Sequence, residues 1–468
     1  MSEDYRTESD SLGEMQVPAD AYWGAQTQRA VENFPISGLT FGRRFVRALG
    51  IVKKAAARAN RDLGLLEENT AEHVIAAAEE VIAGDHDDQF PVDVFQTGSG
   101  TSSNMNANEV IANRATELAG GDVGSREIHP NDHVNYGQSS NDVIPTAMHV
   151  AALEAVENDL LPALRTLVAE LRDREEAFDD VVKTGRTHLQ DATPITLGQE
   201  FSGYRTQVEK GIDRVENTTD RLAELALGGT AVGTGLNTHP EFPGRAAEYV
   251  AAETGIEFRE ADNHFEAQAA HDAMSEAHGA LRTVAGSLHK IANDLRLLAS
   301  GPRNGLGEIE QPENQPGSSI MPGKINPVVA EAVNQVRAQV VGNDATVSAG
   351  AAGGQIDLNL YKPVLAYNFL QSADVLAGAS EAFAEKFVAK LEANRDHARE
   401  RVEQSMALAT ALNPAIGYDR ASKVAKQAIS EGKTVREVVV REGYLSEAEA
   451  EEVLDPASMT DRVILGEE

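Results

Sequence analysis

Apolar residues recur at helical spacing along most of the chain after about residue 138. An apolar stripe with alternating steps of three and four residues marks the buried face of a long helix. Such helices pack side by side at shallow angles. With further helical patterns after Pro327 and Asp357, the sequence predicts about five long helices in a bundle. The stripes comprise Leu153, Leu160, Leu164, Leu167 and Leu171; Phe201, Val208, Val215 and Leu222; and Leu281, Val284, Leu288, Ile291, Leu295 and Leu298.

Three parts of the chain differ in this pattern. We predict a mainly α protein with an N-terminal mixed domain at 1–138, a central long-helix bundle at 139–393 and a small C-terminal helical domain at 394–468. Turns rich in Gly, Asn and Pro characterise the first part, and short helices separated by Gly and Pro characterise the last. Apolar seams on more than one face of the bundle predict helices that are shared between subunits.

The charge balance narrows the possible partners. The 468 residues include 41 Lys and Arg against 74 Asp and Glu, a formal net charge of −33. This excess argues against nucleic acid, which needs basic patches, and against anionic membrane surfaces. The absence of cysteine excludes disulfides, thiolate nucleophiles and cysteine metal sites. With no apolar leader in the first thirty residues and no run long enough to span a bilayer, we expect a cytoplasmic protein.

The basic residues are themselves unevenly divided, with 12 Lys and 29 Arg. One interpretation is compositional drift in a GC-rich genome. The other is adaptation to a very salty cytosol, where an acidic surface keeps a protein soluble and salt screens its self-repulsion. The charge balance favours the second, so we expect a halophilic protein.

Four segments dense in small polar residues interrupt the helical pattern, at 97–104, 138–142, 185–191 and 317–327. Each precedes a predicted helix, so each could serve only as a helix cap. Helix N-termini also offer free N–H groups and a partial positive charge, which bind carboxylates or phosphates. Four such segments, together with Lys324, predict a site for a small polyanion.

Two residues in these segments suggest chemistry. His188 stands beside Arg186 and Thr187 at a predicted helix entry, which distinguishes it from an ordinary core histidine. Ser318 lies in a loop of Gly and Pro, typical of a mobile lid or a strained turn. No nucleophile elbow surrounds it, which disfavours an acyl-transfer serine. Nucleotide and zinc motifs are missing and the twelve histidines show no ligand spacing, so we expect no cofactor and no metal.

The segment Gly-Ser-Ser-Ile-Met-Pro-Gly-Lys-Ile-Asn-Pro at 317–327 closely resembles the signature loop of the fumarase/aspartase superfamily. Further matches at 12–13, 22–27, 128–132 and 412–414 extend the resemblance over essentially the whole chain. Three positions favour fumarase over aspartase: Gly323 before the lysine, His188 after Thr187, and His239 after Asn237-Thr238. Positions 136–137 and 328–330 depart from the usual fumarase pattern.

The resemblance implies the superfamily's mainly helical fold and reversible addition of water to fumarate, giving L-malate, a tricarboxylic acid cycle reaction. It also implies a homotetramer with four active sites, each assembled from three chains. Aspartate ammonia-lyase is the alternative within the superfamily. A catalytically silent structural protein, like the relatives recruited as lens crystallins, is the alternative from another class, although Ser318, Lys324, Asn326 and His188 favour an enzyme.

The implied roles follow the chemistry. Removing a proton from the carbon beside a carboxylate creates a second negative charge, which a pre-organised positive site must hold. Lys324 and Asn326 would do this. Ser318, activated by Lys324 and loop N–H groups, would be the base. His188, oriented by Glu331, would protonate the leaving hydroxyl; alternatively, His188 with Glu331 is the base.

Two further sets of residues are implied by the resemblance. The residues that would hold the substrate carboxylates are Ser99, Thr101, Ser139, Ser140, Asn141 and Thr187. Those that match the superfamily's second carboxylate-binding site are Arg126, His129, Asn131 and Asp132. The plain alternative for the second set is a turn stabilised by Asn131 and Asp132.

Overall fold

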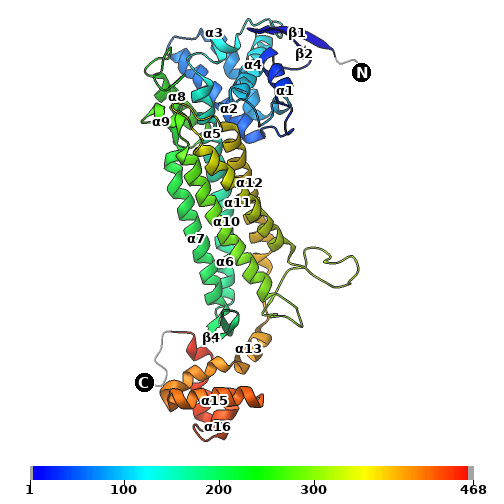
Figure 1. Ribbon diagram of the computed structural model, residues 1–468, viewed down its shortest axis with the longest axis vertical. Coiled ribbons are helices and arrows are strands. Elements are labelled where there is room, and N and C mark those ends of the chain that lie inside the picture. Colours follow the sequence, from blue (N-terminus) through cyan, green and yellow to red (C-terminus); the bar gives the residue numbers. More distant parts are fainter. Residues whose placement is uncertain (1–3, 462–468) are drawn as a thin grey trace. The chain divides into compact units, whose positions relative to one another are not determined.

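The protein is mainly helical, as its pattern predicts, and the computed structural model describes residues 4–461 (Figure 1). Internal contacts divide the chain into two compact units. The first comprises the described residues of Met1–Pro162, Ile212–Ala285 and Val336–Ala377. The second comprises those of Ala163–Gly211, Gly286–Gln335 and Gly378–Glu468.

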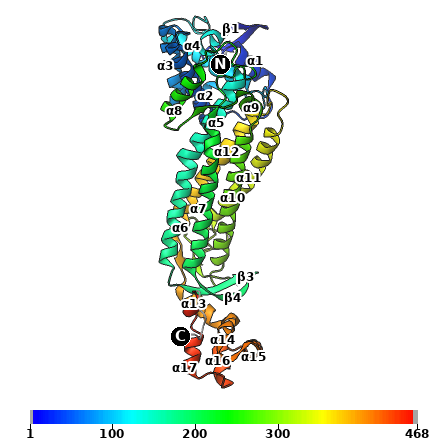
Figure 2. The same cartoon turned by 90° about the vertical axis from the view of Figure 1, so that its left-hand side faces the viewer.

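The five predicted long helices are present, and they form the central bundle (Figure 2). The first is continuous from α5 (Ser140–Ala155) through a π-helical segment, η3 (Val156–Leu160), to α6 (Leu161–Ala177). The others are α7 (Leu197–Leu222), α10 (Asp272–Leu298), α11 (Val328–Ala351) and α12 (Lys362–Lys386). Every residue of the predicted apolar stripes is buried, which confirms the stripes as core. Burial of these stripes, rather than helix propensity alone, stabilises such a bundle.

Polar contacts also join the long helices within each unit. In the first unit, the buried His278 of α10 bonds to Asp344 of α11 and to Ser372 of α12. In the second unit, the Lys290 ammonium of α10 lies 4.6 Å from the ring centroid of Tyr204 on α7. The helices therefore pack against one another through both apolar stripes and specific polar pairs.

The rest of the first unit packs around the parts of the long helices that belong to this unit. An antiparallel hairpin, a parallel pair of two-residue strands and several helices make it up. Its elements are β1 (Tyr5–Asp10), β2 (Gly13–Pro18), α1 (Ala25–Asn33), α2 (Arg43–Asp62), α3 (Glu68–Ala83), η1 (Asp87–Gln89), α4 (Thr101–Leu118), η2 (Pro130–Val134), β5 (Glu224–Leu225), α8 (Phe242–Thr254), β6 (Arg259–Glu260) and α9 (His264–Ala269).

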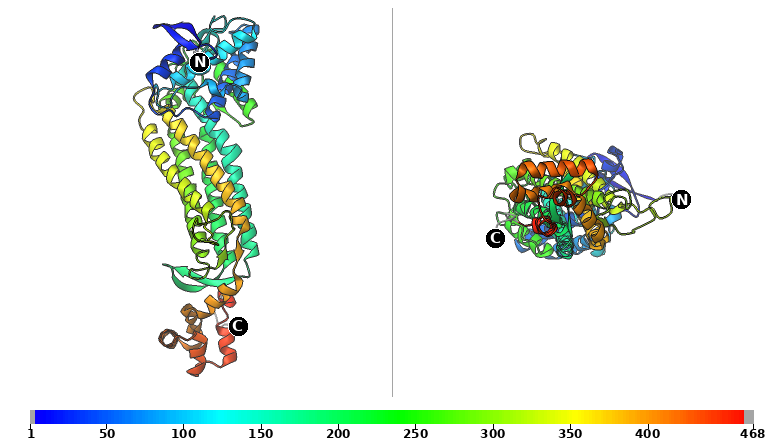
Figure 3. Two further views of the ribbon diagram at one scale, coloured as in Figure 1. Left: turned by 90° about the vertical axis from the view of Figure 1, so that its right-hand side faces the viewer. Right: turned by 90° about the horizontal axis from the view of Figure 1, so that it is seen from below.

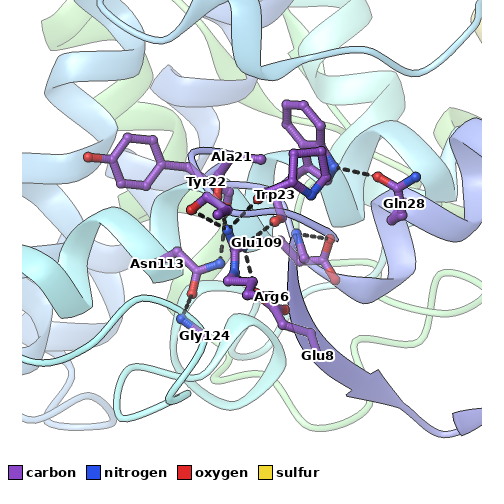
Figure 4. Close-up of polar contacts among 12 residues, drawn as sticks. Arg6, Glu8, Ala21, Tyr22, Trp23, Gln28, Glu109, Asn113 and Gly124 are labelled. Carbon is purple, nitrogen blue, oxygen red and sulfur yellow. Dashed lines mark hydrogen bonds and ion pairs between the residues drawn. The ribbon is translucent and has the colours of Figure 1, made fainter. Parts of the chain in front are cut away.

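A buried carboxylate and a partly buried guanidinium hold the N-terminal segment of this unit in place (Figure 4). The carboxylate of Glu109, on α4, accepts hydrogen bonds from the N–H groups of Gly24, Gln26 and Thr27 at the start of α1. The Arg6 guanidinium donates to carbonyl oxygens between residues 18 and 23. These bonds account for the segment at 22–27, which carries part of the superfamily resemblance: its backbone wraps a buried carboxylate.

The rest of the second unit contains two antiparallel strand pairs and the C-terminal helices (Figure 3). Residues from Leu408 to Leu454 bury an apolar core of their own. Side-chain caps at Thr434 and Ser446 start two of the short helices. The elements are β3 (Val182–Thr187), β4 (Gln190–Thr196), β7 (Ile309–Glu310), η4 (Val388–Lys390), β8 (Glu392–Ala393), α13 (Arg395–Gln404), η5 (Met406–Ala411), α14 (Leu412–Ile416), α15 (Tyr418–Glu431), α16 (Val435–Arg441), α17 (Glu447–Val453) and η6 (Ala457–Met459).

The three-domain division at 138/139 and 393/394 stays a prediction. The two contact-defined units are not consecutive stretches of sequence, because the long helices start in one unit and end in the other. Nowhere between residues 4 and 461 does a helix combine the length and apolar character needed to cross a bilayer.

Candidate active site

In the first unit, two of the predicted polar segments meet through a chain of hydroxyl groups. Helix α4 begins at Thr101 and helix α5 at Ser140, so each helix starts inside its polar segment, and α4 starts earlier than the sequence predicts. The Thr101 Oγ1 lies 2.8 Å from Ser99 Oγ and 2.7 Å from Ser140 Oγ. The structure thus brings together the N-termini of two helices and three of the hydroxyls predicted to hold carboxylates. Paired helix N-termini with hydroxyl donors are suited to binding an anion.

The start of α5 is fixed by a capping box. Ser139 Oγ accepts from the Asn141 N–H at 3.2 Å, and Asp142 Oδ1 accepts from the Ser139 N–H at 2.9 Å. The second oxygen of Asp142 accepts from the N–H groups of Gly228 at 3.0 Å and Thr230 at 2.9 Å. Asp142 is wholly buried, so it ties the segment at 138–142 to the loop at 228–230. Asp142 lies within the predicted polar segment, but the sequence pattern gave no sign of this role.

The segment at 97–101 lies directly against the start of α12. A Cβ on Gly98 would lie 1.9 Å from the carbonyl oxygen of Leu360, so only glycine fits there. The N–H of Lys362 donates to the Gly98 carbonyl at 3.1 Å. Three stretches far apart in sequence, at 97–101, 138–142 and 360–362, therefore share one place in the first unit.

Two buried lysines bond to residues in or next to these segments, and the sequence did not predict a role for either of them. Lys362 Nζ donates to the Asn141 carbonyl at 3.1 Å. Lys53 Nζ donates to Asn135 Oδ1 at 2.8 Å and Gln138 Oε1 at 3.0 Å. Burial lowers the pKa of each lysine to about 7, opposed by attraction to Asp142. Burial also raises the pKa of Asp142 to about 6, although backbone N–H donors and Lys53 act in the other direction.

The residues predicted for a second carboxylate site lie in and just before a π-helical turn, η2. Here His129 supplies the cap: its Nδ1 accepts from the N–H groups of Asn131 and Asp132, both at 3.2 Å. The side chains of Asn131 and Asp132 are exposed rather than buried in the turn. Arg126 has a left-handed backbone, with φ of 61°, and its guanidinium donates to the Ser9 carbonyl. The turn thus depends on His129, with one Asp132 carboxylate oxygen 3.4 Å from its Nδ1, and the Asn131 side chain is exposed to solvent.

His188 does not stand at a helix entry, and that expectation is corrected. It lies at the tip of the β3–β4 hairpin, and the helix that follows begins nine residues later at Leu197. Strand β3 forms because Lys183 and Thr184 are buried there. The Lys183 ammonium bonds to Glu200 at 2.7 Å and lies 3.1 Å from Glu308.

The hairpin tip is strained. Residues 188 and 189 form a two-residue loop between the paired positions Thr187 and Gln190, with φ of 56° and 60°. Left-handed backbone at both positions is normally taken by Asn and Gly, and each exception costs energy. The side chains of Thr187 and His188 are exposed, and among the described residues none hydrogen-bonds to the His188 ring. Strain and open exposure together mark His188 as a functional candidate.

The loop at 317–327 is closed on itself. The Gly317 N–H donates to the Lys324 carbonyl at 2.9 Å, and Asn326 Nδ2 donates to the Gly317 carbonyl at 2.7 Å. A Cβ on Gly317 would lie 2.3 Å from the Lys324 carbonyl oxygen, so glycine is needed for this closure. The residues at 313–318 and 321–325 line an open pocket of about 460 Å³. Helix α11 follows directly, and Pro327 precedes its first residue.

Inside the loop, Ser318 Oγ accepts from the N–H groups of Ile320 at 3.2 Å and Met321 at 3.0 Å. Two such donors would stabilise a serine alkoxide. The Lys324 ammonium donates to Asn326 Oδ1 at 2.8 Å, so its action on Ser318 stays a prediction. Glu331, on the first turn of α11, has Arg296 as its cationic neighbour at 4.0 Å, and its pairing with His188 likewise stays a prediction.

Comparisons with known proteins agree with this arrangement. The chain matches a family described as Lyase over residues 13–342 and one described as Fumarase C C-terminus over residues 408–461. These matches define a lyase of the fumarase/aspartase superfamily.

A protein from Halobacterium salinarum named fumarate hydratase class II is 80% identical over 465 residues, which are 99% of each chain. A protein of the same name from Nitrosomonas europaea is 55% identical over 98% of this chain and 99% of its own. The crystal structure of a recombinant class II fumarase from Schistosoma mansoni has a TM-score of 0.95 at 39% identity, covering 98% of this chain and 99% of that one. The chain belongs to the class II fumarases.

Proposed function

We propose that this chain is a fumarate hydratase, a lyase that adds water reversibly to fumarate and releases L-malate. The observation that carries the proposal is the similarity, along nearly the whole chain, to proteins named fumarate hydratase class II. The geometry of the first unit supports a small dianionic substrate. The N-termini of α4 and α5 are joined by the hydroxyls of Thr101 and Ser140, and the buried Lys362 bonds to the backbone beside them.

The proposed roles divide between the units. In the first, Ser99, Thr101, Ser139, Ser140 and Asn141 bind the substrate carboxylates, with Thr187 contributed by the hairpin. In the second, Ser318 takes the proton from the carbon next to a carboxylate. Its Oγ accepts two loop N–H bonds, which supports this role because they favour the deprotonated oxygen. Lys324, held by Asn326, stabilises the doubly charged carboxylate that results.

His188 protonates the leaving hydroxyl in the malate-to-fumarate direction, with Glu331 orienting it. In the alternative, His188 together with Glu331 is the base, so His188 rather than Ser318 removes the proton from carbon. Arg126, His129, Asn131 and Asp132 form a second carboxylate-binding site at the η2 turn. The exposed side chains of Asn131 and Asp132 beside the His129 ring support this assignment.

We further propose a cytoplasmic homotetramer in which different chains contribute to each site. The support lies in what the single chain exposes. Large apolar side chains are exposed next to several proposed site residues: Leu189 follows His188, and Ile320 and Met321 lie in the loop of Ser318. Ile356, Leu360 and Tyr361, before the start of α12, are exposed as well. Exposed apolar side chains of this size are typical of protein interfaces. His188, exposed and without a hydrogen-bond partner in the described chain, is left for a partner subunit and substrate to complete.

One assay tests the activity. L-malate and L-aspartate are supplied in turn to the purified protein, and the appearance of fumarate is followed by its ultraviolet absorbance. We expect fumarate from L-malate and none from L-aspartate. Fumarate from L-aspartate would identify an ammonia-lyase instead, and no fumarate from either would indicate a silent structural relative.

A further inference from the structure

Helix α5 contains a proline six residues into the helix, and this residue changes the bonding of its first turn. Pro145 has no N–H, and in an α-helix that N–H would donate to the carbonyl four residues earlier. The carbonyl left without its helical partner is that of Asn141, in the segment proposed to bind substrate. Pro145 is buried and Asn141 is partly buried, and a carbonyl taken out of water needs a hydrogen-bond donor.

The Lys362 ammonium donates to the Asn141 carbonyl in place of the missing N–H. Its Nζ lies 3.1 Å from the Asn141 carbonyl oxygen, and its side chain is 0% exposed. The N–H of the same residue donates to the Gly98 carbonyl, also at 3.1 Å. One residue at the start of α12 therefore holds the backbone of both anion-binding segments, one through its side chain and the other through its main chain.

The buried charge of Lys362 contributes little to the stability of the fold. Burying an ammonium is costly unless a carboxylate pairs with it directly. Asp142, the nearest buried acid, gives its oxygens to three backbone N–H groups. Between the pKa of Asp142, about 6, and those of the two lysines, about 7, Lys53, Lys362 and Asp142 together carry one net positive charge near the two helix N-termini. Burial lowers the pKa of the neighbouring His271 well below its ordinary value, so this buried imidazole adds no charge beside Lys362.

We propose that Lys362 is a positioning residue for the hydratase reaction: by occupying the carbonyl that Pro145 leaves open, it holds Asn141 and its neighbours in the geometry that binds the substrate carboxylate. The inference rests on the proposed function, since it assigns the 97–101 and 139–141 segments to substrate. It adds a residue that touches no substrate and acts through Asn141 and Gly98.

The first test compares two buried lysines. Lys362→Met keeps the side chain's length and removes its donor and charge. Lys54→Met is the matched control, because Lys54 is also buried in the first unit but bonds to Glu253 at 2.6 Å and Glu79 at 3.0 Å, both outside the proposed site. We expect Lys362→Met to raise KM for L-malate about tenfold or more, the effect of losing one charge-assisted hydrogen bond. We expect Lys54→Met to leave KM within about twofold.

The second test uses the proline. Pro145→Ala restores an N–H that can donate to Asn141. If Lys362 acts by occupying that carbonyl, the double variant Pro145→Ala/Lys362→Met recovers part of the loss, lowering KM about threefold from the Lys362→Met value, as expected for one neutral hydrogen bond. Pro145→Ala alone is expected to stay close to wild type. A purely structural role of the lysine would lower the amount of folded enzyme without this reciprocal effect on KM.

The outcomes are separable. Wild-type turnover of L-malate is measured first, and its absence would remove the proposed function whatever Lys362 does. With an active wild type, an unchanged KM in Lys362→Met, an equal rise in Lys54→Met, or a double variant as impaired as Lys362→Met would each overturn the positioning role. If Lys362→Met does not fold, the double variant is compared with Pro145→Ala. A double variant that also fails to fold would show that the lysine serves the fold, and the proposal falls.

Discussion

The polar segments of the two units differ in how firmly the surrounding structure holds them. In the first, Ser99, Thr101 and Ser140 are joined by short hydrogen bonds, and the buried Asp142 and Lys362 hold the backbone behind them. In the second, His188 and the loop at 317–327 are largely exposed and are organised only by local turns.

This difference suggests a division of labour. A site that recognises charge is best built rigid, so that no reorganisation is needed when the anion arrives. Groups that move protons and close over substrate are more often carried on loops. We therefore assign substrate binding to the first unit and proton transfer to the second, and we expect variants of the two units to impair different kinetic parameters.

The largest effects are expected in the second unit. Ser318→Ala and His188→Asn should each lower kcat about a hundredfold or more, because each removes a positioned acid or base. Ser319→Ala, which changes the next, exposed hydroxyl of the same loop, is the matched control and should turn over normally. Circular dichroism establishes that each variant is folded. Near-normal turnover in a folded Ser318→Ala or His188→Asn protein would reject that residue's role.

A smaller, pH-dependent effect is expected in the first unit. The pKa of Lys362 is lowered to about 7, so its ammonium is present below that pH and is lost as the pH rises through it. Above neutrality Asp142 is anionic and His271 is neutral, and Lys53, whose pKa is also about 7, loses its charge over the same range, so none of them replaces the lost positive charge. KM for L-malate should therefore rise severalfold between about pH 6 and pH 9.

The Lys362→Met variant separates this effect on substrate binding from pH effects on the chemical step. In that variant the rise in KM should be smaller, while the pH dependence of kcat remains. An identical KM profile in the wild type and in Lys362→Met would show that the buried lysine does not contribute to substrate binding.

The smallest effect concerns the surface charge that both units share. At a net charge of −33, dilute buffer leaves the exposed carboxylates repelling one another, and salt screens this repulsion. The melting temperature and the activity should both be higher in molar KCl than in dilute buffer. A melting temperature that does not change with salt would favour compositional drift over halophilic adaptation.

How much of this could be predicted from the sequence depends on the kind of interaction. The long helices were predictable because stripes such as Leu281–Leu298 repeat at helical spacing, and all of them are buried. The helix start at 138–142 was predictable because Ser139 before an apolar run is a helix cap, whereas α4 starts from Gly100, which makes no side-chain cap bond. These signals are local, and they need no knowledge of what packs against them.

The remainder depends on contacts between distant segments. The hairpin at His188 was missed because a His-Leu pair gives no signal for a turn with two left-handed residues. Lys53 and Lys362 were missed because a lysine in a helical stretch usually lies at the surface. One signal was available. Pro145 inside a predicted helix indicates that the Asn141 carbonyl lacks its helical donor, but the sequence does not indicate which group donates to it instead.

The central claim is that one active site needs groups from different chains, and a complementation experiment tests it most directly. Tetramers of His188→Asn and of Lys324→Ala, each nearly inactive alone, are dissociated together and slowly reassembled. If the two residues of a site come from different chains of a symmetric assembly, random mixing leaves roughly a quarter of the sites with both native residues. Activity should then recover towards a quarter of the wild-type value. Mixed tetramers shown to contain both variants, yet still inactive, would contradict the shared site.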